Sequence, residues 1–143
     1  MEICTIGGYE EVGKNMTAIN LGEDVIIFDA GLHLPSVIEL QGTENSVQTR
    51  SENELRKVGA IPNDLVLDKL GWREKVCAIV IGHAHLDHVG AVPYIASRYP
   101  NATIYGTPFT IEVLKSIVQD EKLKLKNRLE SINPDSTFKI QGK

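Results

Sequence analysis

Three of the four histidines of this chain lie within six positions, in the sequence GHAHLDH. His83 and His85 are two residues apart, so in an extended segment their side chains project to the same side and can reach one ion. Asp87 and His88 follow, and a helix that begins near Asp87 would turn both side chains toward a second position nearby. Nitrogen and oxygen ligands without a thiolate favour zinc, with manganese or iron as alternatives. The spacing therefore predicts a two-metal site.

A further carboxylate ends another apolar run, in the sequence IIFDAG. If the two runs are neighbouring strands, Asp29 lies at the same sheet edge as the histidines and can accept a hydrogen bond from a ligand imidazole, which fixes its tautomer. An aspartate in a turn or cap is the alternative for this residue considered alone. We predict the supporting role. His33 either enters the same pocket or lies in an exposed loop, and we leave it out of the predicted ligands.

The segments that position these residues are short β-type runs. EICTIGG, MTAINLG and DVIIFDAG are separated by turn-forming residues and predict a β meander. VCAIVIG, directly before the histidines, predicts a fully buried strand, and ATIYG predicts the next one. The polar stretch 34–50 is typical of a long surface loop.

Helical patterns occupy the remaining segments. Short helices are expected near 52–58 and within IPNDLVLDKLGW. A helix over 90–99 would bury Val92, Ile95, Ala96 and Tyr99, with Pro93 in its first turn. Thr107 and Pro108 are suited to start a long helix over 108–131. Strands followed by alternating strands and helices indicate a mixed α/β domain.

Composition limits the function classes. A chain of 143 residues with 42% hydrophobic content can form one domain with a real core, and its formal charge of −4 argues against a basic, sequence-independent nucleic-acid binder. No apolar run approaches the roughly 20 residues that cross a bilayer, and the first residues lack a signal-peptide pattern, so no membrane association and a cytoplasmic location are expected. Cys4 and Cys77 are expected to be buried free thiols.

The motifs resemble a known superfamily. HAHLDH followed by VGAVP resembles the HxHxDH signature of the metallo-β-lactamase fold, and IIFDAG resembles the first motif of that fold. More narrowly, GGYEEVGKNMTAI, FDAGLHLP, IPND and HLDHVGAVPYI, which lie within residues 6 to 95, resemble the ribonuclease J group of β-CASP nucleases, most closely its archaeal form.

The resemblance implies an αββα sandwich with a dinuclear zinc site. His83 and His85 would hold one zinc, Asp87 and His88 the other, and Asp29 would support them. The implied substrate is RNA, cleaved from 5′ to 3′ and sometimes internally. A bound zinc ion lowers the pKa of water to about 7, which suits hydrolysis of a phosphodiester.

The family pattern also includes later metal ligands and a β-CASP domain, which we do not find. No histidine follows His88, and the chain stops at FKIQGK, where another strand is expected to start. The resemblance therefore implies that residues 1–143 are the N-terminal portion of a metallo-β-lactamase domain, weakly active by itself. Half a sandwich leaves an apolar sheet face open, so we expect self-association or pairing with the missing C-terminal portion.

Alternatives remain open from the residues alone. A small-molecule hydrolase of the thioesterase or lactonase type shares the metal motif, and a non-catalytic assembly module is the third class. In GGYEEVGKN, Lys14 and the glycines either approach the substrate phosphate or form a plain turn. The run KLKLKNR is either an RNA patch or a solvated helix face, and its acidic neighbours favour the helix face.

Overall fold

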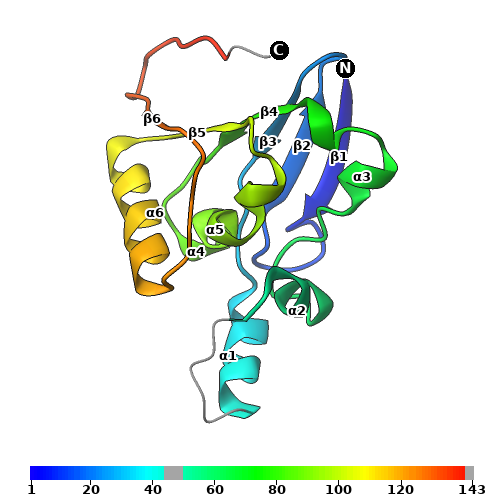
Figure 1. Cartoon of the computed structure of the whole chain (residues 1–143), viewed down its shortest axis with the longest axis vertical. Helices are drawn as coiled ribbons and strands as arrows, with labels where there is room; N and C mark the ends of the chain where they lie inside the picture. Colours follow the sequence, from blue (N-terminus) through cyan, green and yellow to red (C-terminus); the bar gives the residue numbers. More distant parts are fainter. Residues whose placement is uncertain (44–49, 141–143) are drawn as a thin grey trace.

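The computed structural model describes residues 1–43 and 50–140, and its centre is one six-stranded sheet (Figure 1). In both chain and sheet order the strands are β1 (Glu2–Gly7), β2 (Met16–Asn20), β3 (Val25–Phe28), β4 (Val76–Val80), β5 (Thr103–Gly106) and β6 (Leu129–Ser131). The first three strands are antiparallel, and β3 to β6 pair in parallel. The predicted meander and the mixed α/β class are confirmed.

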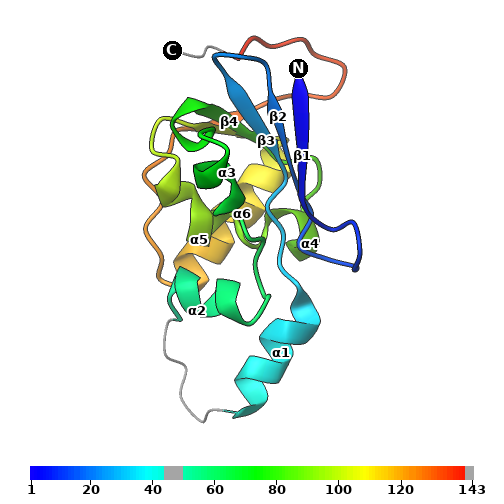
Figure 2. The same ribbon diagram turned by 90° about the vertical axis from the view of Figure 1, so that its right-hand side faces the viewer.

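The helices are short, apart from two. The α-helices are α1 (Leu34–Thr43), α2 (Glu52–Lys57), α3 (Val66–Lys69), α4 (Leu86–Val89), α5 (Val92–Ile95) and α6 (Pro108–Asp120). Two 3₁₀ helices are η1 (Arg73–Lys75) and η2 (Ala96–Arg98). In the described ranges, none is long and apolar enough to span a bilayer. α1 extends away from the sheet (Figure 2).

One face of the sheet carries the core. The strand register aligns Ala18, Ile27, Ile79 and Ile104 across β2 to β5, and all four are fully buried. Buried side chains from α2, α3, α5 and α6 belong to the same apolar cluster: Leu55, Leu67, Ile95 and Leu114. Burial of this strand row beneath helices is the main source of stability, because each fully buried aliphatic side chain contributes about 1.5–3 kcal/mol.

The other face of the sheet is only partly covered. Its rows contain Ile3, Ile19, Ile26, Phe28 and Val80, which we call the open sheet face. Ile3 is 59% exposed and Phe28 is 39% exposed. The described residues therefore form one sheet with helices packed on one face and a second face that is only partly covered.

Residues 34–43 and the end of α6 differ from the sequence prediction. Residues 34–43 form α1 where a loop was predicted, because Pro35 lies in the first turn, where its missing N–H costs nothing. Val37 and Leu40 of α1 pack against the core; the rest of that predicted loop, 44–49, lies outside the described residues. The long helix over 108–131 starts at the predicted cap but ends at Asp120.

The end of α6 has a local cause. Lys122 adopts a left-handed φ of 52°, and the Leu123 N–H donates to the Val118 carbonyl oxygen at 3.0 Å. A chain that turns out of the helix in this way closes it as a C-cap does. The segment that follows leads into β6, where sequence analysis predicted helix. The predicted strand at the chain end is also absent over 138–140, and 141–143 lie outside the described residues.

The predicted helix over 90–99 is divided into α5 and η2, although its buried stripe is confirmed. Pro93 lies at the start of α5 as expected. The helix predicted near 52–58 is α2, with a capping box between Ser51 and Glu54. Of the helix predicted within 61–72, only the single turn α3 forms.

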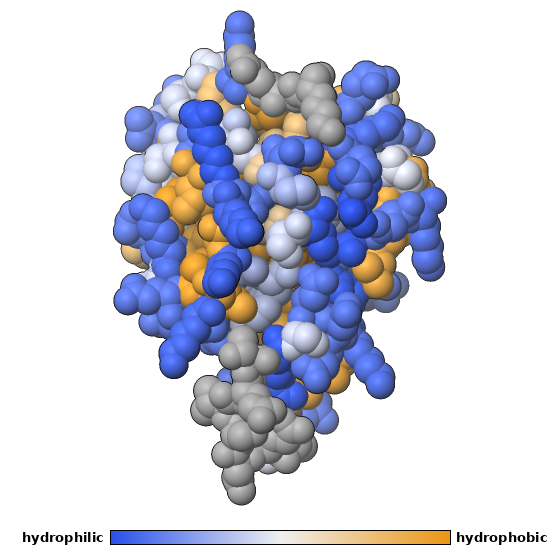
Figure 3. Space-filling view, in the orientation of Figure 1, coloured by the Kyte–Doolittle hydropathy of each residue, from blue (hydrophilic) through white to orange (hydrophobic). Residues whose placement is uncertain are grey.

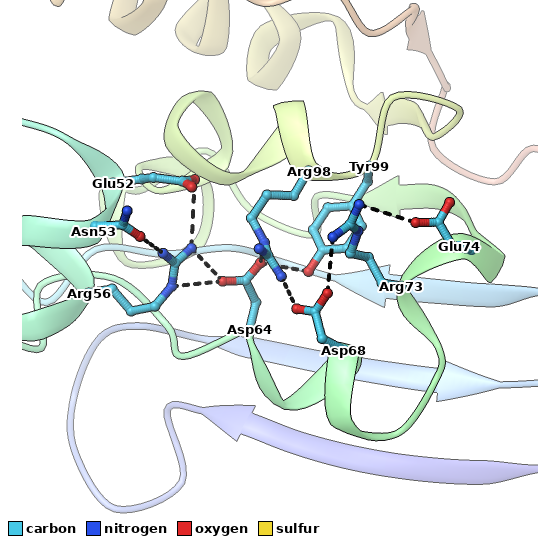
Figure 4. A network of polar contacts seen from close by, with 9 residues as sticks. All are labelled: Glu52, Asn53, Arg56, Asp64, Asp68, Arg73, Glu74, Arg98 and Tyr99. Carbon is cyan, nitrogen blue, oxygen red and sulfur yellow. Dashed lines mark hydrogen bonds and ion pairs between the residues drawn. The ribbon is translucent and has the colours of Figure 1, made fainter.

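A buried ion network joins α2, α3 and η2 (Figure 4). Asp64 is fully buried and accepts hydrogen bonds from Arg56 Nη2 at 2.8 Å, Arg98 Nε at 2.8 Å and the Tyr99 hydroxyl at 2.6 Å. Arg98 also pairs with Asp68. A buried carboxylate is tolerated only when it is paired and hydrogen-bonded in this way. The network stabilises this layer of short helices, because helices of one or two turns are not stable by themselves.

Candidate metal centre

Two backbone segments meet α4. The turn after β3 is attached to α4 by the Ala30 N–H, which donates to the His88 carbonyl oxygen at 2.8 Å. The segment before β2 is attached by the Asn15 N–H, which donates to the Asp87 carbonyl oxygen at 3.1 Å. A Cβ atom on Gly31 would lie 1.6 Å from that same oxygen, so only glycine permits this approach. These contacts bring the predicted site residues from distant parts of the sequence to one place.

The carboxylate of Asp29 has two hydrogen-bond partners at this place. Its Oδ2 lies 2.9 Å from His88 Nδ1, and its Oδ1 accepts from the Gly82 N–H at 2.7 Å. Asp29 has a left-handed φ of 60°, which turns the chain at the end of β3. Because a carboxylate only accepts hydrogen bonds, Nδ1 of His88 is the donor in this pair, and Nε2 is the ring nitrogen on the side away from Asp29. This carboxylate–imidazole pair is the arrangement found behind metal-ligating histidines.

The four predicted ligands are neighbours in space. His88 Nε2 lies 3.4 Å from Asp87 Oδ2. The ring centroid of His83 is 4.1 Å from that of His85 and 5.4 Å from that of His88. His83 and His85 are exposed, whereas Asp87 and His88 are half-buried. The structure therefore brings these side chains together at the end of β4, on the edge that the sequence predicted.

The donor set fits a divalent ion, but the side chains do not yet converge. Across residues 1–43 and 50–140, no three His, Cys, Asp or Glu side chains are arranged so that they could hold one ion. Imidazole nitrogens and a carboxylate are nevertheless the ligands that zinc takes in hydrolytic sites. The exposed rings of His83 and His85 are the ones with room to rotate, and the assignment of the four residues as ligands stays a prediction.

Sequence analysis missed Asn15. Its side-chain Nδ2 donates to the Asp87 carbonyl oxygen at 2.9 Å and also lies 3.4 Å from Asp87 Oδ2 and 3.5 Å from His88 Nε2. Within GGYEEVGKN the sequence drew attention to Lys14 instead, whose Nζ pairs with Glu11 at 3.6 Å. No sequence pattern distinguishes an asparagine that makes these contacts from an ordinary asparagine in a glycine-containing turn.

Other residues considered from the sequence lie outside the cluster. His33 Nδ1 lies 2.7 Å from the Ser36 hydroxyl at the start of α1. Cys4 and Cys77 are free thiols, but half-buried instead of buried. Burial raises the pKa of both thiols, and Asp24 raises that of Cys77 further.

The run KLKLKNR does not form a helix face. Lys122 and Lys124 of this run border a cavity between α6 and the segment before β6, with Val118, Leu123, Leu125 and Leu129 among the lining residues. Figure 3 shows apolar surface in this region, crossed by hydrophilic side chains. The acidic neighbours of this run led us to predict a solvated helix face. That prediction was wrong, because residues 121–128 are not helical.

Comparison with known proteins gives a consistent result. The family model of the metallo-beta-lactamase superfamily matches residues 9–141. Ribonuclease J of Methanocaldococcus jannaschii is 46% identical over 141 residues, which are 98% of this chain and 30% of that protein. Ribonuclease J of Pyrococcus abyssi is 46% identical over 122 residues, covering 85% of this chain and 26% of that protein. The chain thus spans less than a third of the length of these relatives.

A solved structure supports the fold. A crystal structure of a protein of unknown function from Enterococcus faecalis V583 superimposes with a TM-score of 0.63, at 18% identity, over 97% of this chain and 35% of that one. At this identity the similarity shows the fold alone.

Proposed function

The chain belongs to the metallo-beta-lactamase superfamily, and from that premise we propose that it carries part of the active site of a ribonuclease that hydrolyses RNA phosphodiesters. Membership of the superfamily implies divalent metal ions. The 46% identity with two archaeal ribonucleases J supports RNA as the substrate. Cleavage from the 5′ end, with some internal cleavage, is part of the proposal.

We assign two zinc ions to the site, with manganese as the alternative. His83 and His85 would hold one ion, and Asp87 and His88 the other. When bound, such ions supply an activated water and stabilise charge on the phosphoryl oxygens. The role of Asp29 is to hold the proton on His88 Nδ1, 2.9 Å away, so that Nε2 is free to bind metal. That contact is the single observation that carries the proposal, because it joins two motifs 59 residues apart in the orientation a metal ligand requires.

The described side chains do not fill two coordination shells. We propose that this chain is the N-terminal portion of a metallo-β-lactamase domain and that further metal ligands come from sequence beyond these 143 residues. The chain alone would then be weakly active. The open sheet face supports pairing with that remaining portion or self-association. The two free cysteines suit a reducing compartment, and we place the protein in the cytoplasm.

The test is a substrate panel on the longer protein that contains these residues. We expect metal-dependent cleavage of single-stranded RNA that is lost in His85→Ala and retained in His33→Ala, the histidine outside the cluster. Hydrolysis of thioesters or lactones without any action on RNA would establish the small-molecule alternative instead. No hydrolysis of any substrate would favour a non-catalytic assembly module.

A further inference from the structure

We propose that Asn15 is a positioning residue that holds Asp87 and His88 ready to bind their metal ion. The inference rests on the proposed function, because it concerns the same site. It assigns a role to the segment GGYEEVGKN that the metal motifs do not explain.

The backbone of Asn15 is fixed on both sides. Its N–H donates to the Asp87 carbonyl oxygen at 3.1 Å, and its carbonyl oxygen accepts from the Gly31 N–H at 3.1 Å. The residue therefore links the turn after β3 to α4. Its side chain starts from a backbone position that is held by the two segments that carry Asp29 and Asp87.

The orientation of the side-chain amide follows from its neighbours. Nδ2 lies 2.9 Å from the Asp87 carbonyl oxygen, a contact that only the NH2 group can make, because two oxygens would repel each other. The amide oxygen lies on the side of Gly8, where a Cβ atom would be 2.2 Å from it. Gly8 thus leaves space for the oxygen, and the NH2 group is turned toward α4.

The second N–H of Asn15 faces the two metal-binding atoms. Asp87 Oδ2 lies 3.4 Å from Nδ2, and His88 Nε2 lies 3.5 Å from it. Asp87 Oδ2 has two lone pairs, so it can accept from Asn15 and bind metal at once, whereas His88 Nε2 has one and would exchange the donor for the ion. The amide therefore keeps the carboxylate and the imidazole together in the absence of metal. Pre-orientation by such a partner typically accounts for about 10–100-fold in metal affinity.

The experiment compares Asn15→Ala with Asn20→Ala. Asn20 is the matched control, because its Nδ2 donates to Glu2 at 2.9 Å, at the other end of β2. Co²⁺ titration of the longer protein that contains these residues, followed by visible absorption and calorimetry, should show binding weakened about 10-fold or more in Asn15→Ala and unchanged in Asn20→Ala. Unchanged binding in both variants would overturn the proposal, as would tighter binding in Asn15→Ala.

A measurement without metal separates this inference from the proposed function. In chelator-treated protein, the ¹⁵N resonance of His88 Nε2 should shift in Asn15→Ala, because this nitrogen loses a hydrogen-bond donor, while the Nδ1–H tautomer persists through Asp29. Asn15→Leu, which keeps the approximate shape of the side chain, removes the donor and adds no charge, should show the same loss if Asn15→Ala is poorly folded. A resonance that does not move in either variant would refute the role of Asn15, even if the chain binds no metal and the proposed function fails.

Discussion

The buried network around Asp64 gives a stability prediction that can be worked from its contacts. Tyr99 is 1% exposed, and its hydroxyl donates to Asp64 Oδ2 at 2.6 Å. Burial and the neighbouring Asp64 carboxylate raise the pKa of the Tyr99 phenol, so the group remains a donor. Replacement of Tyr99 by Phe removes one hydrogen bond to a charged acceptor and leaves no cavity. Such bonds contribute about 1.5–3 kcal/mol to the free energy of unfolding.

Urea unfolding followed by circular dichroism measures this loss. With an m-value of about 2 kcal/mol/M, a loss of about 2 kcal/mol lowers the urea midpoint of Tyr99→Phe by about 1 M. Tyr9→Phe is the matched control, because Tyr9 is 60% exposed, and its midpoint should change little. Asp64→Ala should lose more, about 3–5 kcal/mol, since it leaves the Arg56 and Arg98 guanidiniums without their shared partner. A Tyr99→Phe midpoint equal to that of the wild type would refute the view that this network stabilises the helical layer.

The remaining predictions concern acid stability, thiol reactivity and association. Burial raises the pKa of Asp68, but hydrogen bonds from Arg98 and Arg73 outweigh it and leave the pKa below its ordinary value. The stabilisation is therefore present above about pH 4 and lost as the pH falls further. The difference in urea midpoint between wild type and Asp68→Asn should shrink from pH 7 to pH 3. A difference that stays constant would contradict a stabilising Asp68 carboxylate. Cys4 and Cys77, with raised pKa values, should react with a disulfide reagent at pH 8 more slowly than in the urea-unfolded chain, and equal rates would show that burial does not protect them. The open sheet face should make the chain self-associate in light scattering, and a monomer at all working concentrations would count against this.

The parts of the fold that were predictable have strong local signals. Apolar runs bounded by turn residues located all of the first five strands, and the cap Thr107 with Pro108 located the start of α6. The end of α6 was not predictable, because the charged second half of the segment is compatible with helix until tertiary contacts place Leu129 beside β5. α1 was missed because Pro35 was read as a loop residue, although a proline is compatible with a first helical turn.

The candidate site also contains residues that the sequence predicts and one that it does not. Spacing alone predicted that His83 and His85 lie together, and the ends of two strands predicted that Asp29 lies near them. Asn15 could not be predicted, because its role depends on a backbone approach between the turn after β3 and α4 that only the folded chain reveals. Local pattern thus locates the residues that would bind metal, while the residue that orients two of them comes from tertiary structure.

The most direct test of the central claim is the amount of metal bound per chain. We would measure it by elemental analysis after dialysis against metal-free buffer, in the longer protein that contains these residues, on its wild type, on His85→Ala and on His33→Ala. The account predicts zinc bound by the wild type and by His33→Ala, and reduced or lost in His85→Ala. Equal metal content in all three proteins would contradict a metal centre at GHAHLDH, as would the absence of any bound metal after zinc is supplied in excess.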